Sequence, residues 1–139
     1  MTKERTLCLI KPDAVAEGNI GKIITMLENN NFHILKMKML IMNQELAQKF
    51  YYVHKEKHFY EELICFMTNN YIVAMILERE DAIKKLRSLA GDTDSKIASP
   101  ETIRNKYGTD NSHNAVHASD SLESYLYESE VIFGNEKSE

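Results

Sequence analysis

The sequence predicts an α+β fold in which helices pack on a four-stranded sheet with the element order βαββαβ. Two uninterrupted apolar runs, at residues 6–10 and 71–77, are typical of buried strands. An alternating segment at 32–42 is typical of a strand with one wetter face. Segments with helical spacing of apolar residues follow these strands, so we expect the helices to cover one face of the sheet.

The first half of the chain carries two of the strands and a pair of helical segments. Pro12 closes the strand at 6–10, so we expect a loop that starts at Lys11. A helix is predicted next, because apolar residues recur with a spacing of three and four at Ile20, Ile23, Ile24 and Leu27. In the strand at 32–42, we expect Lys36 and Lys38 on the outer face or edge of the sheet, alternating with Leu35, Met37, Met39 and Ile41. Two further helical patterns within 44–69 predict a helical hairpin.

The second half begins with the buried strand at 71–77 and a helix that has acidic residues at its start and stops at Gly91. Residues 92–114 are polar and too long for an idle loop, which favours a functional role. A brief strand at 115–118 follows. Asp120 and Glu123 have capping-box spacing. They predict a helix that buries Leu122, Tyr125, Leu126, Ile132 and Phe133.

Length and composition favour one folded domain over residues 1–139, with a frayed tail at 134–139. The formal net charge of -4 disfavours general nucleic-acid binding. No apolar segment is long enough for a signal peptide or a membrane span, so we expect neither export nor a membrane partner. Cys8 and Cys65 lie inside apolar runs, which predicts buried, reduced thiols and a cytoplasmic protein.

His117, in the stretch NAVHASDS, is the first candidate for chemistry. It ends a short strand just before a helix, where a side chain is held rigidly and still meets solvent. A neutral imidazole can attack without a separate base if a carboxylate fixes its tautomer, and Glu128 on the following helix is a candidate for that carboxylate. The alternative is a structural histidine hydrogen-bonded to Ser119 or Asp120.

Three cationic residues, Lys11, Arg87 and Arg104, stand at or near the ends of predicted elements. If they converge, they form an anion clamp suited to phosphoryl transfer, although each alone is more often a surface charge. Thr93 adds a hydroxyl group. Phe59 with its neighbour Tyr60 offers a flat face for a base, although a helical phenylalanine more often belongs to the core. The sequence contains no P-loop, no GxGxxG turn and no zinc-type ligand spacing.

The stretches IKPDAV, FYYVHKEKHF, TIR and NAVHASDS, in this order, closely resemble the nucleoside diphosphate kinase family. The resemblance runs from about residue 6 to residue 133. Its most specific element is N-x-x-H-[G/A]-S-D, which is complete at Asn114, His117, Ala118, Ser119 and Asp120. The resemblance implies a ferredoxin-like domain with an antiparallel four-stranded sheet. It also implies transfer of the γ-phosphate of a nucleoside triphosphate, mainly ATP, to a nucleoside diphosphate through a phosphohistidine, by a ping-pong route.

The resemblance assigns roles to individual residues. It implies that His117 attacks through Nδ1, that Glu128 holds the other ring nitrogen, and that Ser119 bonds to that carboxylate. Tyr51 lies close to the transferring phosphoryl group. The implied nucleotide contacts are Arg87, Thr93 and Arg104 to phosphates, Lys11 and Asn114 to ribose hydroxyls (with Lys11 also near the transferring group), and Phe59 and Leu63 to the base.

The resemblance also implies Mg²⁺ and a homo-oligomer, either a hexamer or a tetramer. The ion is expected to bridge the nucleotide's phosphates without a permanent protein ligand, since the sequence offers no dedicated carboxylate cage. Stacking on Phe59 is expected to tolerate purines and pyrimidines alike.

This chain departs from the family pattern in the segment 92–114 and next to Phe59. His58 replaces a proline, Asp94-Ser95 replaces Asn-Pro, and Glu101 replaces a glycine. We expect Glu101 to point to solvent, because an inward carboxylate would weaken an anion site. Two other readings share parts of the pattern. An RNA-recognition domain has the same element order but needs exposed aromatics on its central strands, where only Tyr71 is offered. A pseudoenzyme is disfavoured because every position that the family chemistry uses is present.

Overall fold

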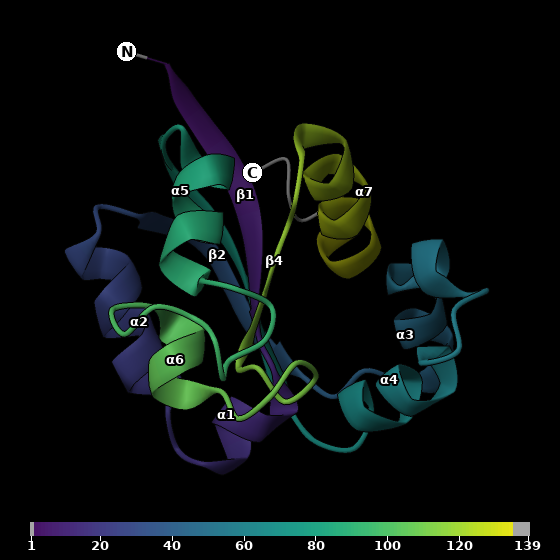
Figure 1. Ribbon diagram of the computed structural model, residues 1–139. Coiled ribbons are helices and arrows are strands. Elements are labelled where there is room, and N and C mark those ends of the chain that lie inside the picture. Colours follow the sequence, from purple (N-terminus) through teal and green to yellow (C-terminus); the bar gives the residue numbers. More distant parts are fainter. Residues whose placement is uncertain (1, 135–139) are drawn as a thin grey trace.

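The sheet and helices are described by a computed structural model that covers residues 2–134 (Figure 1). The elements in chain order are β1 (Lys3–Ile10), α1 (Pro12–Ala16), α2 (Ile20–Asn29), β2 (His33–Leu40), α3 (Gln44–Phe50), the 3-10 helix η1 (Tyr52–His54), α4 (Tyr60–Met67), β3 (Ile72–Glu80), α5 (Ala82–Ala90), α6 (Ile103–Tyr107), β4 (Val116–Ala118) and α7 (Leu122–Phe133). The strands form one antiparallel sheet in the order β2-β3-β1-β4. The predicted α+β class, the βαββαβ order and the helical hairpin α3–α4 are confirmed.

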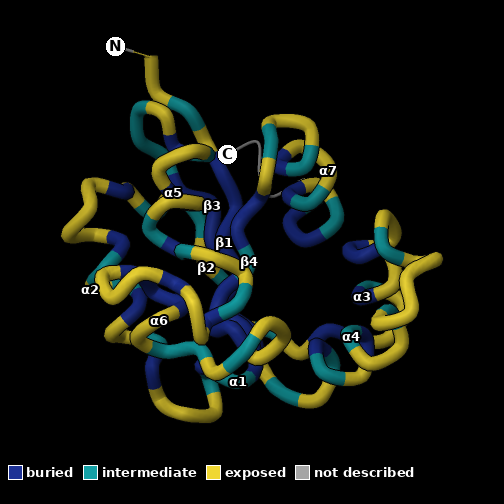
Figure 2. The backbone as a smooth tube through the Cα atoms, in the orientation of Figure 1, coloured by how far each residue is buried: buried dark blue, intermediate teal, exposed yellow. Residues whose placement is uncertain are grey.

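Helices cover both faces of the sheet, so the expectation of helices on one face was wrong. Alternate residues of β1 enter two separate cores. Cys8 and Ile10 pack under α2, α5 and α6, whereas Leu7 and Leu9 pack under α3, α4 and α7. Figure 2 shows the buried residues concentrated on the central strands. A strand buried on both faces is a continuous apolar run, which is why the sequence shows no alternation there.

The pairing of β4 with β1 determines where His117 points. His117 lies opposite Leu9 in the antiparallel register, with Ala118 opposite Cys8. Side chains of directly paired residues share a face of the sheet. His117 therefore points to the face that α3 and α7 cover, while its two neighbours in β4 enter the other core.

The expected exposure of the lysine face of β2 was also wrong. Lys36 and Lys38 are half-buried, and the Nζ of Lys38 lies 5.2 Å from the centre of the Phe133 ring. The other face of the strand is the exposed one, with Leu35 39%, Met37 55%, Met39 51% and Ile41 51% exposed. Lysine stems can cover apolar surface while their charge reaches water, so alternation alone does not identify the buried face.

The structure differs from two predictions about where helices begin. Pro12 opens helix α1 and does not start a loop, with Lys11 at the N-cap. Proline suits the first turn of a helix, because its missing N–H has no partner there. The N-cap of α7 is Ser121, whose side chain accepts a hydrogen bond from the backbone N–H of Ser124. Asp120 instead accepts from the Ser124 hydroxyl at 2.5 Å.

Three side chains predicted to be buried are exposed. Leu122 and Leu126 lie on the outer face of α7 with about half of their surface accessible, whereas Tyr125, Ile132 and Phe133 are buried as predicted. Cys8 is buried, but Cys65 is exposed, because α4 turns Ile64 and Met67 toward the core and Cys65 away from it.

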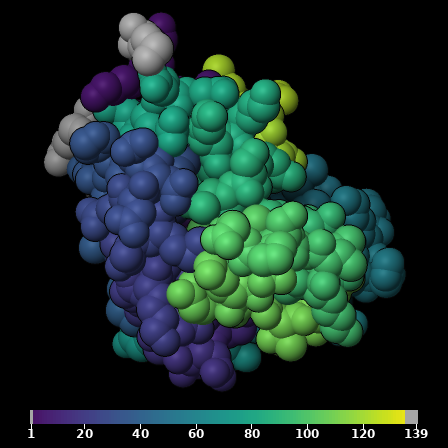
Figure 3. All heavy atoms as spheres, turned by 60° about the vertical axis from the view of Figure 1, so that its left-hand side comes forward, coloured from purple at the N-terminus to yellow at the C-terminus, as the bar shows by residue number. Residues whose placement is uncertain are grey.

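The segment 92–114 is partly helical and folds back on the sheet. It contains α6, whose Ile103 shares a core with residues of α2 and α5, and the segment forms the green lobe of the surface in Figure 3. Glu101 is exposed, as expected. The C-cap of α7 is Gly134, and the remainder of the predicted frayed tail, residues 135–139, lies outside the described residues. Within residues 2–134, every helix is too short or too polar to cross a bilayer.

Candidate active site

A hydrogen-bonded group of three side chains surrounds His117. The Nε2 atom of His117 lies 2.9 Å from Oε1 of Glu128, and the hydroxyl of Ser119 donates to the same oxygen at 2.7 Å. The side chains of His117 and Glu128 are 22% and 13% exposed. The carboxylate thus favours the tautomer with hydrogen on Nε2, which leaves the lone pair of Nδ1 free for chemistry. The alternative of a histidine bonded to Ser119 or Asp120 does not match these contacts.

Aromatic rings from α3 flank the imidazole. The ring centre of Phe50 lies 5.1 Å from that of His117, and the ring of Tyr51 lies at 6.2 Å, both edge to face. Tyr51 is 5% exposed, and burial, with a smaller contribution from Glu128, raises the pKa of its phenol. The phenol therefore stays protonated and can donate a hydrogen bond to an anion beside His117.

Two arginines approach β4 from the other face of the sheet. Arg104 on α6 is 7% exposed and donates to the carbonyls of Gly91 and Val116 at 2.8 and 3.0 Å. Arg87 on α5 donates to the carbonyl of Ala118 at 3.3 Å. The residues on both sides of His117 are therefore held by guanidinium groups. Burial lowers the pKa of Arg104, and the positive charge of Arg87 lowers it further.

Lys11 completes the group of cations. It is 6% exposed, and its ammonium donates to Oδ1 of Asn114 at 2.8 Å and to the carbonyl of Ser112 at 3.0 Å. Burial lowers the pKa of Lys11 to about 8; Asp13 and Asp110 act against this and Arg104 adds to it. The backbone N–H of Lys11 also donates to the Ala115 carbonyl at 2.8 Å, which ties this residue to the strand that carries His117.

The remaining predicted site residues lie on the α3–α4 hairpin and on the 92–114 segment. Thr93 is exposed, and its carbonyl accepts a hydrogen bond from the Asn114 amide at 2.9 Å. Phe59 caps the start of α4 and is 37% exposed, while Leu63 follows one turn later on the same helix and is half-buried. Phe59 and Leu63 thus stand on the α3–α4 hairpin, and Thr93 and Asn114 on the 92–114 segment.

Several residues near the site were not singled out from the sequence. Phe50 belongs to a helical apolar pattern that carries no functional signal, although its ring touches His117. His54 stacks on Tyr51 and contacts Phe59, and its buried Nδ1 lacks a hydrogen-bond partner among residues 2–134. Phe66 and His113 are in mutual ring contact. His54 could have been suspected from its place in the family stretch FYYVHKEKHF, whereas His113 lies outside the family stretches, and the aromatic contacts depend on tertiary structure.

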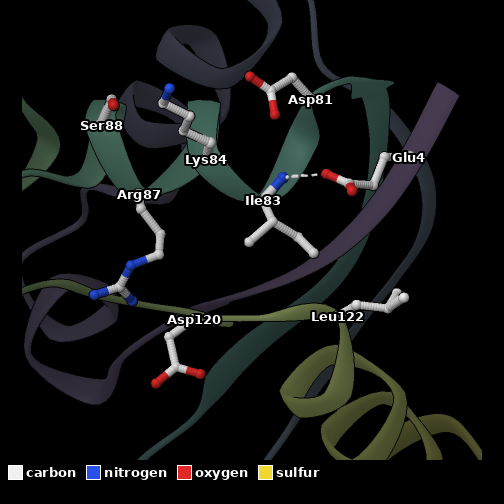
Figure 4. Close-up of a pocket in the computed structure, with 8 residues that line it drawn as sticks. All are labelled: Glu4, Asp81, Ile83, Lys84, Arg87, Ser88, Asp120 and Leu122. Atoms are coloured by element: carbon white, nitrogen blue, oxygen red, sulfur yellow. Dashed lines mark hydrogen bonds between the residues drawn. The ribbon is translucent and has the colours of Figure 1, made fainter. Parts of the chain in front are cut away.

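A cavity of about 580 Å³ lies beside the site, between α5 and the start of α7 (Figure 4). It shares Arg87 and Asp120 with the surroundings of His117, and its other lining residues are Glu4, Asp81, Ile83, Lys84, Ser88 and Leu122. Glu4 accepts a hydrogen bond from the backbone N–H of Ile83 at 2.9 Å. A carboxylate from β1 therefore caps the first turn of α5, the helix that carries Arg87.

The arrangement combines an accessible imidazole nitrogen with a buried acceptor for the opposite ring nitrogen. Phosphoryl transfer needs positioning and positive charge more than covalent assistance. Arg87 and Arg104 hold the backbone carbonyls on either side of His117, Lys11 is bonded to Asn114, and the Tyr51 ring lies 6.2 Å from the imidazole. Residues 2–134 contain no cluster of three or more His, Cys, Asp or Glu side chains placed to hold a metal ion. The geometry therefore suits nucleophilic transfer of an anionic group.

Comparisons with known proteins agree with this chemistry. The family model for nucleoside diphosphate kinase matches residues 4–138. The nucleoside diphosphate kinase of Aquifex aeolicus is 47% identical over 136 residues, covering 96% of each chain. That of Staphylothermus marinus is 48% identical over 137 residues, covering 99% of this chain and 97% of the relative.

Solved structures of such kinases have the same fold. The Aquifex aeolicus enzyme superposes with a TM-score of 0.92 at 46% identity, covering 95% of this chain and 96% of that one. A halophilic nucleoside diphosphate kinase from Halobacterium salinarum, solved in complex with CDP, gives 0.91 at 37% identity and covers 95% and 88% of the two chains. The sequence match over nearly the whole length and the matching fold together show that this chain belongs to the nucleoside diphosphate kinase family, a family of phosphotransferases.

Proposed function

We propose that His117 accepts the γ-phosphoryl group of a nucleoside triphosphate on Nδ1 and passes it to a nucleoside diphosphate. In the first half-reaction, the Nδ1 lone pair forms a bond to phosphorus, and the bond from phosphorus to the bridging oxygen breaks, so the diphosphate leaves. The second half-reaction reverses these steps with the terminal oxygen of another diphosphate as nucleophile. The observation that carries this proposal is the 2.9 Å contact of Nε2 with Glu128, which in the neutral ring favours the hydrogen on Nε2 and the lone pair on Nδ1.

We assign the surrounding cations to the triphosphate. Arg87 and Arg104 contact its phosphates with the hydroxyl of Thr93, while Lys11 stands between the transferring group and the ribose. This assignment is supported by the mutual influence of the three cations: the charge of Arg104 lowers the pKa of Lys11, and the charge of Arg87 lowers the pKa of Arg104. Tyr51 donates to an oxygen of the transferring group, which its buried and protonated phenol permits. Charge that develops on the phosphate oxygens is thus met by donors already in place.

We assign the base to the α3–α4 hairpin and the sugar to Lys11 and the 92–114 segment. Asn114 and Lys11, joined at 2.8 Å, face the ribose hydroxyls. Phe59 stacks on the base, and Leu63 packs beside it. An aromatic ring accepts any base face, so discrimination among bases is expected to be weak.

We propose that Mg²⁺ would arrive bound to the nucleotide, without a site of the chain's own. The donor chemistry of the site fits this role, because the carboxylate of Glu128 is already engaged by His117 and Ser119, and Asp120 by Ser124. The ion neutralises part of the phosphate charge, while the orientation of the phosphates falls to the chain's own cations.

We propose that the chain acts as a single domain within a cytoplasmic homo-oligomer. The exposed apolar row on β2, formed by Leu35, Met37, Met39 and Ile41, supports assembly, because monomers rarely leave such a row on an edge strand. A hexamer and a tetramer are both compatible with one such contact. The buried free thiol of Cys8 suits a reducing compartment.

Labelling with radioactive ATP tests the proposed nucleophile. The intact protein is expected to acquire acid-labile label from γ-labelled ATP and to lose it on addition of dTDP. His117→Ala abolishes the label, whereas His33→Ala, which removes an exposed histidine at the start of β2, keeps it. Label that persists in His117→Ala at the normal rate overturns the assignment of the nucleophile.

A further inference from the structure

Beyond the proposed catalytic residues, one contact joins the two segments that form the nucleotide site. The rings of Phe66 and His113 lie with their centres 4.5 Å apart and their planes at 62°, an edge-to-face pair. Phe66 is on α4, the helix that carries Leu63 and begins after Phe59. His113 is on the 92–114 segment, immediately before Asn114. The pair therefore links the element proposed to hold the base to the segment proposed to hold the ribose.

Phe66 also contacts the lysine at the centre of the site. The Nζ of Lys11 lies 5.5 Å from the centre of the Phe66 ring. A cation over an aromatic face is attracted to the ring, and an edge-to-face contact with a second aromatic ring is also favourable. Phe66 is half-buried, whereas His113 is exposed. The Phe66 ring thus contacts both the His113 imidazole and the Lys11 ammonium.

Hydrogen bonds to Asp110 also fix the backbone around His113. Oδ1 of Asp110 accepts hydrogen bonds from the backbone N–H groups of Ser112 and His113 at 2.9 and 2.8 Å. These bonds lower the pKa of Asp110 to about 2, so its carboxylate remains charged. The turn places the Ser112 carbonyl and the Asn114 amide oxygen where both accept from Lys11. The ring of His113 has its Nδ1 3.5 Å from Oδ1 of Asp110 in the same turn, and it also contacts Phe66 on α4.

We propose that His113 is a positioning residue for nucleotide binding, which acts by clamping the 110–114 turn to α4 through the ring of Phe66. This inference rests on the proposed nucleotide site and adds to it a residue that touches neither the reacting atoms nor the phosphates. The clamp fixes the separation between the base-binding helix and the Lys11–Asn114 pair. Removing the imidazole loosens that separation and weakens binding, while phosphoryl transfer at saturation continues.

Three variants of His113 test the clamp through the KM for dTDP and ADP, the kcat at saturation and the dissociation constant of ADP. An aromatic edge contact of this kind corresponds to roughly a three- to tenfold change in an equilibrium constant. His113→Ala and His113→Gln are expected to raise KM and the dissociation constant by about this factor, with kcat within about twofold. His113→Phe, which keeps an aromatic edge, restores both. Lys96→Ala, an exposed side chain on the same segment, is the matched control and changes neither.

The partner is tested with Phe66→Leu and the double variant Phe66→Leu/His113→Ala. If His113 acts through Phe66, the double variant is no worse than Phe66→Leu alone. Three results overturn the clamp: unchanged KM in His113→Ala, restoration by Gln but not by Phe, or additive effects in the double variant. Each of these leaves an active, labelled enzyme, whereas failure of the proposed function is recognised by label that survives in His117→Ala.

Discussion

At the residue scale, a single oxygen atom determines what His117 can do. Oε1 of Glu128 accepts from Nε2 of the imidazole and from the Ser119 hydroxyl, so it fixes both the tautomer and the rotation of the ring. In the proposed reaction, the same carboxylate would stabilise the positive charge that the ring gains when Nδ1 binds phosphorus. Ser119, fully buried, keeps the carboxylate in place.

Replacing the charge of this carboxylate while keeping its shape isolates its contribution. Glu128→Gln is expected to lower the rate of phosphoenzyme formation about 10- to 100-fold, since a hydrogen bond to a charged group is worth about 1.5–3 kcal/mol. Rapid-quench measurement of labelled His117 gives this rate. Glu123→Gln, which changes an exposed carboxylate on the same helix, is the control. A rate for Glu128→Gln equal to that of the control would contradict the role of Glu128.

Lys11 predicts a pH dependence of nucleotide affinity. Burial lowers the pKa of its ammonium to about 8 in the free protein, and a bound polyanion raises that pKa again. Binding therefore takes up a proton once the pH exceeds about 8, and the dissociation constant of ADP rises by up to about tenfold per pH unit until the pKa of the complex is reached. Calorimetric titrations in this range measure the effect. Lys11→Met, which keeps the stem without the charge, is expected to bind weakly and to show no such rise; an equal slope in both proteins would refute the assignment.

At the element scale, the end of α5 shows how backbone conformation supports the site. Gly91 has a φ of 92°, and its carbonyl accepts a hydrogen bond from Arg104 at 2.8 Å. A Cβ atom at this position would lie 2.6 Å from the Cβ of Thr102. Only glycine adopts this conformation at little cost and leaves room for the segment that carries Arg104.

Gly91→Ala is accordingly expected to lower the free energy of unfolding by about 1–3 kcal/mol and to raise the KM for nucleotides, because the strain moves Arg104 with its segment. Gly21→Ala is a matched control, since nothing lies within 4 Å of its added Cβ and it stands in the regular helix α2. That variant is expected to be more stable by about 0.5–1 kcal/mol. Urea unfolding monitors both; a harmless Gly91→Ala would show that the position tolerates a side chain.

At the scale of the whole molecule, the two faces of the sheet are unequally covered at β2. Its apolar row is exposed in the single chain, and the strand lies at one edge of the described sheet. The other edge, β4, is covered by α7 and by the two arginines that hold its carbonyls. The unprotected edge is thus the one remote from the chemistry.

If this row is an interface, charging it dissociates the assembly. Met37→Lys/Met39→Lys is expected to shift the mass measured by light scattering toward that of the single chain, 16.1 kDa. The reason is that burying two unpaired charges in an interface costs on the order of several kcal/mol. Val53→Lys charges a residue that is 77% exposed on the α3–α4 hairpin and leaves the mass unchanged. An unaltered assembly in the double variant would place the interface elsewhere.

Particular positions show which features of the fold the sequence predicts correctly and which it does not. Periodicity identified the strands and the helices of the α3–α4 hairpin, because an apolar spacing depends only on which residues enter a core. Periodicity gave the wrong exposure for Lys36 and Lys38, because a long side chain can lie over apolar surface. It also gave the wrong exposure for Cys65, which lies on the outer side of the short helix α4. It also placed the helices on one face, since a run such as Leu7–Ile10 is equally apolar on both.

The order of residues by itself determined the class of fold and the family, and it singled out the residues to which we assign the chemistry, because these depend on short local patterns such as Asn114 to Asp120. Tertiary structure alone decided which oxygen holds His117, how the arginines reach β4, and that Phe66 meets His113. Those contacts join segments distant in the chain, and their distances follow from strand register and helix packing, which no local pattern encodes.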